Sequence, residues 1–170
     1  MITSWVDEAY NKPDGKGLPE IIFHIQAQKY FSKDQLINLV KILILGGNET
    51  TPTLASSALY HLVCNPGLME DVRHEKVQFE IFINEVLRFY APTQIIARTT
   101  KTDIVIGGML IPANSLVNVG IGAANRDPDF FENPNDFYLD RPKGRILSFG
   151  HGAHHCIGAS LAKQETRIIF

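Results

Sequence analysis

The chain has 170 residues, of which 45% are hydrophobic and 20% are charged. This length suits one compact domain, and the composition excludes a disordered or fibrous protein. The net charge of -2 gives no reason to expect a nucleic acid or an acidic membrane as partner, and two cysteines, Cys64 and Cys156, are too few for a disulfide framework.

The N-terminal stretch "MITSWVDEAYNKPDGKG" lacks the basic and then apolar pattern of a signal peptide. The longest apolar run, "LINLVKILILGG", contains Lys41 and ends at two glycines. It falls short of the roughly 20 apolar residues that a membrane helix needs. We therefore expect a cytoplasmic chain that binds neither membrane nor nucleic acid.

The first half of the sequence predicts helices. A short opening helix and the turn-rich "NKPDGKG" precede a helix that begins near Pro19 and continues through "EIIFHIQAQKY". Ser32, followed by Asp34 and Gln35, is typical of an N-cap that opens a long helix. That helix contains "GGNETTP", whose glycines and proline are expected to weaken or bend it. Its apolar residues have helical spacing: Leu36, Leu39, Val40, Leu43 and Ile44.

The second half begins with another helix and then changes its pattern. The apolar stripe of "QFEIFINEVLRFY" predicts a helix that ends at Ala91-Pro92. "DIVIGG" and "MLIPANSLVNV" predict a hairpin that turns at Gly107-Gly108. "NRDPDFFENPNDFYLDRPKG" is rich in loop residues, and "ASLAKQETRIIF" begins a last helix. Together these elements predict a mainly α fold with small β-sheets, of the α+β class.

The stretch "FGHGAHHCIG", residues 149–158, has three interpretations from its residues alone. His151, His154, His155 and Cys156 are too close together for all four to ligate one tetrahedral zinc ion comfortably. The glycines would let the backbone adopt positive φ angles and approach a flat ligand. A thiol followed at once by a helix lies near amide dipoles that favour the thiolate, an arrangement that fits ligation of haem iron. A buried cysteine in a glycine-rich turn is the structural alternative.

This stretch resembles the haem-binding signature of the cytochrome P-450 family, in the bacterial or archaeal form that has a histidine two residues before the cysteine. The residues that match it without a gap are Phe149, Gly150, Gly152, His154, Cys156, Gly158, Leu161 and Ala162. The resemblance implies haem b as cofactor, held by the Cys156 thiolate and contacted by the rest of the loop.

A second resemblance lies on the helix that ends at Ala91. Glu85 and Arg88 match the family's Glu-x-x-Arg motif; three residues apart on a helix, they share a face and can form a charge-assisted pair. Arg141, in "NDFYLDR", occupies the place of the arginine that joins them in the family. The resemblance implies that these three residues hold the haem loop. An ordinary surface pair is the alternative.

The glycines of the long helix resemble the family's oxygen-binding groove. Gly46 and Gly47 would leave room for dioxygen beside the haem, and Glu49 and Thr50 match the acid–alcohol pair. Splitting the O–O bond needs the delivery of two protons while bulk water is kept out. A hydroxyl with a carboxylate behind it can deliver these protons. Asn48 departs from the longer or aromatic residue usual in this motif. The alternative is that Thr50 only bonds back to the preceding turn.

Further positions follow from the same resemblance. Arg98, in "TQIIARTT", matches the arginine that holds a haem propionate, and His154 matches the second such residue. Gln94 and Ile96 are expected to face the distal pocket and to help select the substrate. The alternative for Arg98 is a cation at the edge of a strand.

The resemblance covers nearly the whole chain, but members of the family are much longer. We expect residues 1–170 to form a single partial domain, from the long central helix through the haem loop into the following helix. A truncated or split gene, a proteolysed or swapped fragment, and a partial record of a longer protein would each explain this length.

The function implied is that of a haem-thiolate monooxygenase, or the core piece of one. It would use O₂ and electrons from a ferredoxin- or flavoprotein-type partner to oxidise a small apolar organic substrate, and the parent protein would be a monomer. A peroxygenase that uses peroxide directly and a non-catalytic haem-binding chain are the alternatives.

Overall fold

The structure is a computed structural model that describes residues 30–142 and 144–170. The chain divides into two compact units, Met1–Glu49 and Thr50–Phe170. One helix, α3 (Lys33–Cys64), continues through the boundary without a break, so the expectation of one partial domain stays a prediction. The helices predicted before residue 30 lie outside the described residues.

The start of α3 is the described part of the first unit, and it has the predicted cap. The backbone N–H of Ser32 donates to Oε1 of Gln35 at 2.7 Å, and the N–H of Gln35 donates to Oγ of Ser32 at 3.3 Å. These reciprocal bonds form a capping box that satisfies donors at the first turn. Leu36 and Val40 are buried, whereas Ile44 at the end of the predicted stripe is exposed.

The glycines and the proline do not interrupt α3. It remains α-helical through Gly46, Gly47 and Pro52, although proline removes one helical hydrogen bond. The residues that follow Pro52 explain this persistence, because Leu54 and Ala58 are fully buried in the core of the second unit. Tertiary packing of one helix face outweighs unfavourable local propensity here.

The core of the second unit forms between α3 and α5 (Phe79–Tyr90). The predicted stripe of α5 is confirmed, and the helix ends at Ala91, whose φ of 41° is left-handed. A further helix that the sequence analysis did not predict, α4 (Pro66–Arg73), packs Leu68, Met69 and Val72 against this core. The buried core residues are Leu54, Ala58, Leu62, Phe82, Ile83, Val86 and Leu87.

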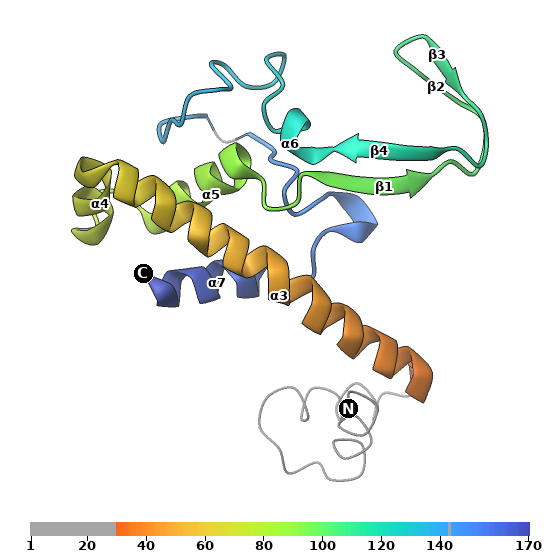
Figure 1. Cartoon of the computed structure of the whole chain (residues 1–170), viewed down its shortest axis with the longest axis horizontal. Coiled ribbons are helices and arrows are strands. Elements are labelled where there is room, and N and C mark those ends of the chain that lie inside the picture. The colour runs from red at the N-terminus through yellow and green to blue at the C-terminus, as the bar shows by residue number, and fades with distance from the viewer. Residues whose placement is uncertain (1–29, 143) are drawn as a thin grey trace. The chain divides into compact units, whose positions relative to one another are not determined.

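The strands form two small antiparallel sheets (Figure 1). β1 (Ile95–Thr99) pairs with β4 (Leu116–Gly120), and β2 (Ile104–Ile106) pairs with β3 (Met109–Ile111). The predicted turn at Gly107-Gly108 is confirmed, with φ angles of 57° and 78°. The predicted strand over "MLIPANSLVNV" is wrong in its middle, because Pro112 and the left-handed Asn114 (φ 62°) form a turn between β3 and β4.

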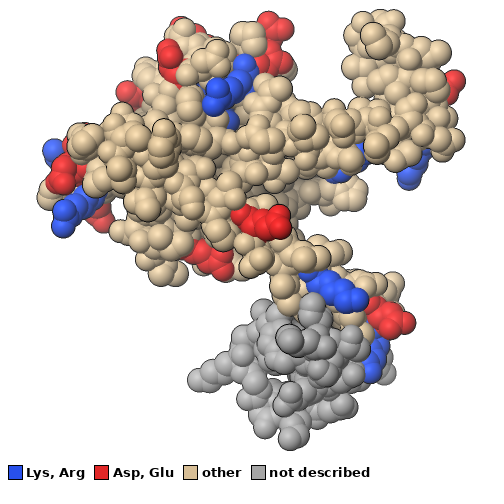
Figure 2. All heavy atoms as spheres, viewed as in Figure 1, with Lys and Arg blue, Asp and Glu red and all other residues tan. Residues whose placement is uncertain are grey.

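The β2–β3 hairpin extends from the far end of the β1–β4 ribbon (Figure 1). Its eight residues, 104–111, include no charged side chain, and this part of the surface is correspondingly free of charge in Figure 2. Val105, Ile106, Met109 and Leu110 are all exposed.

After β4 the chain forms the short helix α6 (Ile121–Ala124). The described residues from 125 to 151 form neither helix nor strand, as predicted, and a 3₁₀ turn (Gly152–His154) leads to α7 (Ala159–Ile169). α5 packs against both α6 and α7. The mainly α class with small sheets is thus confirmed. None of the described helices is long and apolar enough to cross a membrane.

Candidate functional site

The loop of residues 149–158 is closed by its own backbone. The N–H of Gly150 donates to the carbonyl of Leu147 at 2.8 Å, and the N–H of Cys156 donates to the carbonyl of Phe149 at 2.8 Å. Gly150 and Gly152 have φ angles of 70° and 71°, which residues with a Cβ rarely adopt. A Cβ at Gly152 would meet no atom within 4 Å, so backbone conformation rather than space requires glycine there.

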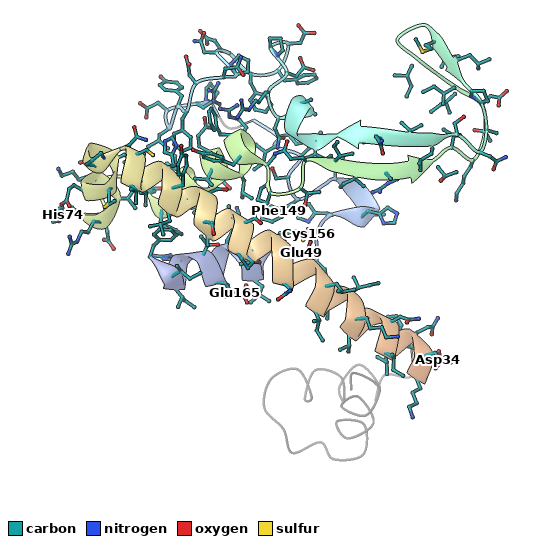
Figure 3. The ribbon with its side chains drawn as sticks, viewed as in Figure 1. Asp34, Glu49, His74, Phe149, Cys156 and Glu165 are labelled. Atoms are coloured by element: carbon teal, nitrogen blue, oxygen red, sulfur yellow. The ribbon has the colours of Figure 1, made fainter. Side chains whose placement is uncertain are left out.

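Cys156 lies at the surface of this loop, immediately before α7 (Figure 3). Its carbonyl accepts a bond from the N–H of Ala159 at 3.3 Å, which joins the loop to the helix. Ile157 is 79% exposed and Leu161 is 58% exposed, so apolar surface flanks the thiol. A Cβ at Gly158 would lie 3.9 Å from Sγ, which is an ordinary van der Waals contact. An accessible thiol in apolar surroundings suits a flat apolar ligand that binds through its metal.

The histidines of the loop do not gather around the thiol. Nε2 of His151 lies 3.3 Å from Nη1 of Arg145, and the ring of His155 lies 6.4 Å from that of Phe149. Among the residues that the structure describes, no three His, Cys, Asp or Glu side chains form a group that could hold a metal ion. The described part of the chain therefore offers no zinc site made from this cluster.

Glu85 and Arg88 form a buried pair on α5. Nε and Nη2 of Arg88 donate to the two carboxylate oxygens of Glu85 at 2.8 and 2.7 Å, and the two side chains are only 1% and 6% exposed. Arg141 joins the pair through a contact of 3.4 Å from Nε to Oε1 of Glu85. The structure thus brings all three predicted residues together, and their burial excludes an ordinary surface pair.

The two arginines fix the irregular segment that follows α6. Their guanidinium groups donate to backbone carbonyls, which is how a segment without helix or strand satisfies its polar groups. Tyr138 adds a backbone N–H bond to Oε1 of Glu85 at 2.9 Å. The carbonyls that accept are, for Arg88, those of Asn125, Pro134 and Asp136, and, for Arg141, those of Glu132, Asn133 and Asp136.

Two residues that the sequence analysis did not single out connect this region to the cysteine loop. Oδ1 of Asn125 accepts from the N–H of Leu147 at 2.7 Å, and its Nδ2 donates to Oγ of Ser148 at 2.8 Å. The Ser148 hydroxyl donates to the carbonyl of Leu87 on α5 at 2.6 Å. Asn125 stands in the stretch whose composition is typical of loops, and no periodic pattern marks a contact across 23 or 61 residues.

Gln94 lies at the end of α5. Its Nε2 donates to the carbonyls of Tyr90 and Ala91 at 2.6 and 2.8 Å, which caps two carbonyls that the helix leaves without partners. A Cβ at Gly122 would lie 2.1 Å from Oε1 of Gln94, so the glycine makes room for this side chain. The predicted role of Gln94 in substrate selection stays a prediction.

The predicted propionate residues are both exposed. Arg98 lies on β1, opposite Val117, and its Nη1 donates to the carbonyl of Ala97 at 2.8 Å. His154 ends the 3₁₀ turn of the cysteine loop. Ile96, two residues before Arg98 on the same strand, is half-buried. Their roles toward a haem stay predictions.

The predicted oxygen-groove residues lie on α3. Gly46, Gly47 and Glu49 belong to the first unit, Thr50 opens the second, and all four are exposed. A Cβ at either glycine would meet nothing within 4 Å beyond the helix itself. The proton-delivery role of Glu49 and Thr50 stays a prediction.

Beside the buried ion pair, His61 of α3 contacts two aromatic residues. Its Nδ1 lies 2.9 Å from the Tyr90 hydroxyl, and its ring stacks on Phe137 with 3.7 Å between centroids. Burial lowers the pKa of His61, and the negative charge of Glu85 opposes that shift. Burial likewise raises the pKa of Tyr90. Both groups are therefore favoured in their neutral forms.

Comparison with known proteins matches the family model for cytochrome P450 over residues 18–170. The chain is 34% identical, over 163 residues, to the putative cytochrome P450 YjiB of Bacillus subtilis; the match covers 96% of this chain and 41% of that protein. It is 39% identical, over 140 residues, to cytochrome P450 109 of Bacillus spizizenii; this match covers 82% of this chain and 35% of that protein. The chain thus spans about two-fifths of the length of these relatives.

Solved structures of cytochromes P450 also match this chain. P450BioI, in complex with a hexadec-9Z-enoic acid ligated acyl carrier protein, matches with a TM-score of 0.88 and 31% identity over 98% of this chain and 43% of that chain. CYP109E1 of Bacillus megaterium, in complex with corticosterone, matches with a TM-score of 0.87 and 31% identity over 99% of this chain and 45% of that chain. Together with the cysteine loop and the buried Glu85–Arg88–Arg141 group, these matches show that the chain belongs to the cytochrome P450 family.

Proposed function

We propose that this chain is the haem-binding part of a haem-thiolate monooxygenase, with Cys156 as the ligand of the iron. The observation that carries the proposal is the exposed thiol on a loop whose shape is fixed by hydrogen bonds and by two positive-φ glycines. When bound, haem b with a thiolate ligand supplies the electron density that favours O–O cleavage.

The loop residues present the thiol and bind the ring. The positive φ angles of Gly150 and Gly152 would let the backbone approach the ring closely, and Phe149 packs against the hydrophobic core and anchors the loop. Gly158 and Ala162 follow the thiol in the chain, and as small residues they would let the ring approach this part of the loop. The exposed apolar side chains beside Cys156 lose their contact with water when the ring covers them.

The charged and polar residues act at the edges of the ring and on the oxygen side. Arg98 and His154 donate hydrogen bonds to the propionates, for which both have suitable N–H groups. Glu49 and Thr50 would provide the carboxylate and the hydroxyl through which protons reach the oxygen side of the site. Gly46 and Gly47 leave room for O₂ because they carry no side chain.

The substrate class and the electron source complete the proposal. We expect a small apolar organic substrate, with Gln94 and Ile96 among the residues that select it. P450BioI was solved with a fatty acid ligated to a carrier protein and CYP109E1 with corticosterone, and both ligands are largely apolar. Electrons would come from a ferredoxin- or flavoprotein-type donor. The two free cysteines agree with a reducing compartment, the cytoplasm, and we expect the parent protein to be a monomer.

The absorbance of the reduced, carbon monoxide-bound chain tests the proposal. After reconstitution with haem we expect the thiolate-type spectrum in the wild-type chain and in Cys64→Ser, since Cys64 lies on α3 and not in the loop. We expect its loss in Cys156→Ser, which removes the thiolate donor. A thiolate-type spectrum that persists in Cys156→Ser would contradict the assignment.

A further inference from the structure

We infer that Asn125 and Ser148 are positioning residues for the Cys156 loop. They tie the segment that precedes the thiol to α5 and to the buried Glu85–Arg88 pair. This inference deepens the proposed function and rests on it for the connection to haem. The hydrogen bonds that support the inference all join residues of this chain.

Asn125 is a buried residue whose side-chain amide and backbone groups all form hydrogen bonds. The residue is 0% exposed. Its Oδ1 accepts from Leu147, its Nδ2 donates to Ser148, and its backbone carbonyl accepts from Nη1 of Arg88 at 3.2 Å. A buried amide with its hydrogen bonds satisfied specifies one arrangement, because any other leaves buried groups unpaired. Asn125 therefore holds residues 147 and 148 in one position relative to Arg88.

Ser148 carries this connection on to α5. Its hydroxyl accepts from Asn125 and donates its one proton to the carbonyl of Leu87. That carbonyl also accepts from the N–H of Ala91 at 3.1 Å, at the end of the helix. The segment is thus attached to the helix that contributes most of the buried core.

The residues held in this way are those that close the loop. Leu147, whose N–H bonds to Asn125, supplies the carbonyl that accepts from Gly150. Phe149, next to Ser148, supplies the carbonyl that accepts from Cys156. A displacement at 147 or 148 is therefore passed through two backbone hydrogen bonds to the residue that carries the thiol.

The test must separate positioning of the loop from a general loss of stability. Amide hydrogen exchange of the full chain without haem does so, because it reports local opening residue by residue. We compare Asn125→Ala and Ser148→Ala with Thr100→Val. Thr100 is a matched control: it is also a buried polar residue, and its hydroxyl donates to the carbonyl of Pro112 at 2.7 Å, but it lies just after β1 and not beside the cysteine loop.

We expect exchange at Leu147, Gly150 and Cys156 to speed up by about tenfold relative to the core amides of α5 in both alanine variants, since a buried hydrogen bond is lost. Thr100→Val is expected to leave that ratio unchanged. Ser148→Thr keeps the hydroxyl and is expected to restore slow exchange. Asn125→Asp keeps the acceptor for Leu147 but not the donor to Ser148, and is a second variant if Asn125→Ala does not fold.

The carbon monoxide spectrum of the haem-reconstituted chain supplies the second readout. We expect Ser148→Ala to lose a larger fraction of the thiolate-type absorbance than Thr100→Val does. Loop amides that exchange no faster than α5 amides, or an undiminished thiolate-type absorbance, would overturn the inference. If the wild-type chain shows no thiolate-type absorbance, the proposed function fails, and the exchange ratio still decides whether Asn125 and Ser148 position the loop.

Discussion

At the scale of single residues, Thr50 offers a direct test of proton delivery. If Thr50 acts as proposed, removing its hydroxyl in Thr50→Ala is expected to disturb transfer of the second proton more than the flow of electrons. In the Thr50→Ala variant of the parent protein, supplied with electrons by a donor, we therefore expect more of the reduced oxygen to be released as peroxide. The quantity to measure is peroxide formed per electron pair consumed, with Thr53→Ala on the same helix as control.

An unchanged yield of peroxide in Thr50→Ala would show that Thr50 has only a structural place in α3. An equal rise in Thr53→Ala would assign the effect to the helix as a whole.

His61 gives a prediction about pH. Burial lowers its pKa in the folded chain below the ordinary 6.5, so the unfolded chain binds the proton more readily. The stability that depends on neutral His61 is fully present above about pH 6.5, the ordinary pKa, and is lost as the pH falls below it through the lower pKa of the folded chain. We expect His61→Gln, which keeps a hydrogen-bonding side chain but cannot titrate, to lessen this loss.

The measurement is the free energy of unfolding by urea at about pH 7.5 and about pH 5.5 for both proteins. The difference between the two proteins isolates His61 from the five other histidines. An identical pH dependence in His61→Gln would refute the prediction.

At the scale of elements, α5 depends on Arg88. Arg88 makes five hydrogen bonds, to Glu85 and to three backbone carbonyls. Lysine has no planar guanidinium group and cannot make these hydrogen bonds together, so it would leave the buried carboxylate of Glu85 poorly paired. We expect Arg88→Lys to lower the free energy of unfolding by about 3–5 kcal/mol, measured by urea denaturation.

Arg73→Lys on α4 is the matched control. Its 3.9 Å ion pair with Glu70 is also spaced i,i+3 but is exposed to solvent. We expect a change within about 0.5 kcal/mol there. Similar losses in the two variants would mean that burial of the Arg88 pair has no special importance.

The elements also show what sequence patterns could predict. The stripe of α5, the Ser32 cap and the Gly107-Gly108 turn depend on residues a few positions apart, and all three are confirmed. α4 was missed although Asn65 and Pro66 are typical of a helix start, because its eight residues span only about two helical turns.

The candidate site was predictable only in part, because some of its residues contact partners that are distant in the chain. Cys156, Glu85 and Arg88 stand in short motifs that a sequence displays directly. Asn125 and Ser148 act through partners that lie 22 to 61 residues away in the chain. Neither hydrophobic period nor turn chemistry carries information about such distant partners, so these two residues required the structure.

At the scale of the whole molecule, exposed apolar surface governs the behaviour of the chain on its own. The four exposed apolar side chains of the β2–β3 hairpin and those beside Cys156 form patches that water solvates poorly. We therefore expect residues 1–170, expressed alone, to self-associate and to bind haem weakly. Size-exclusion chromatography with an equilibrium haem titration measures both. A tight, stoichiometric and monomeric complex would contradict this expectation.

The anchorage of Ser148 to Leu87 has a consequence for the order of folding. The two residues are 61 positions apart, and Tyr138 reaches Glu85 across 53. Contacts between α3, α4 and α5 close much shorter loops and can form while the later part of the chain is still disordered. The thiol loop reaches its final shape only after the chain through residue 148 has returned to α5. Haem capture is therefore expected to follow, rather than initiate, collapse of the helical core.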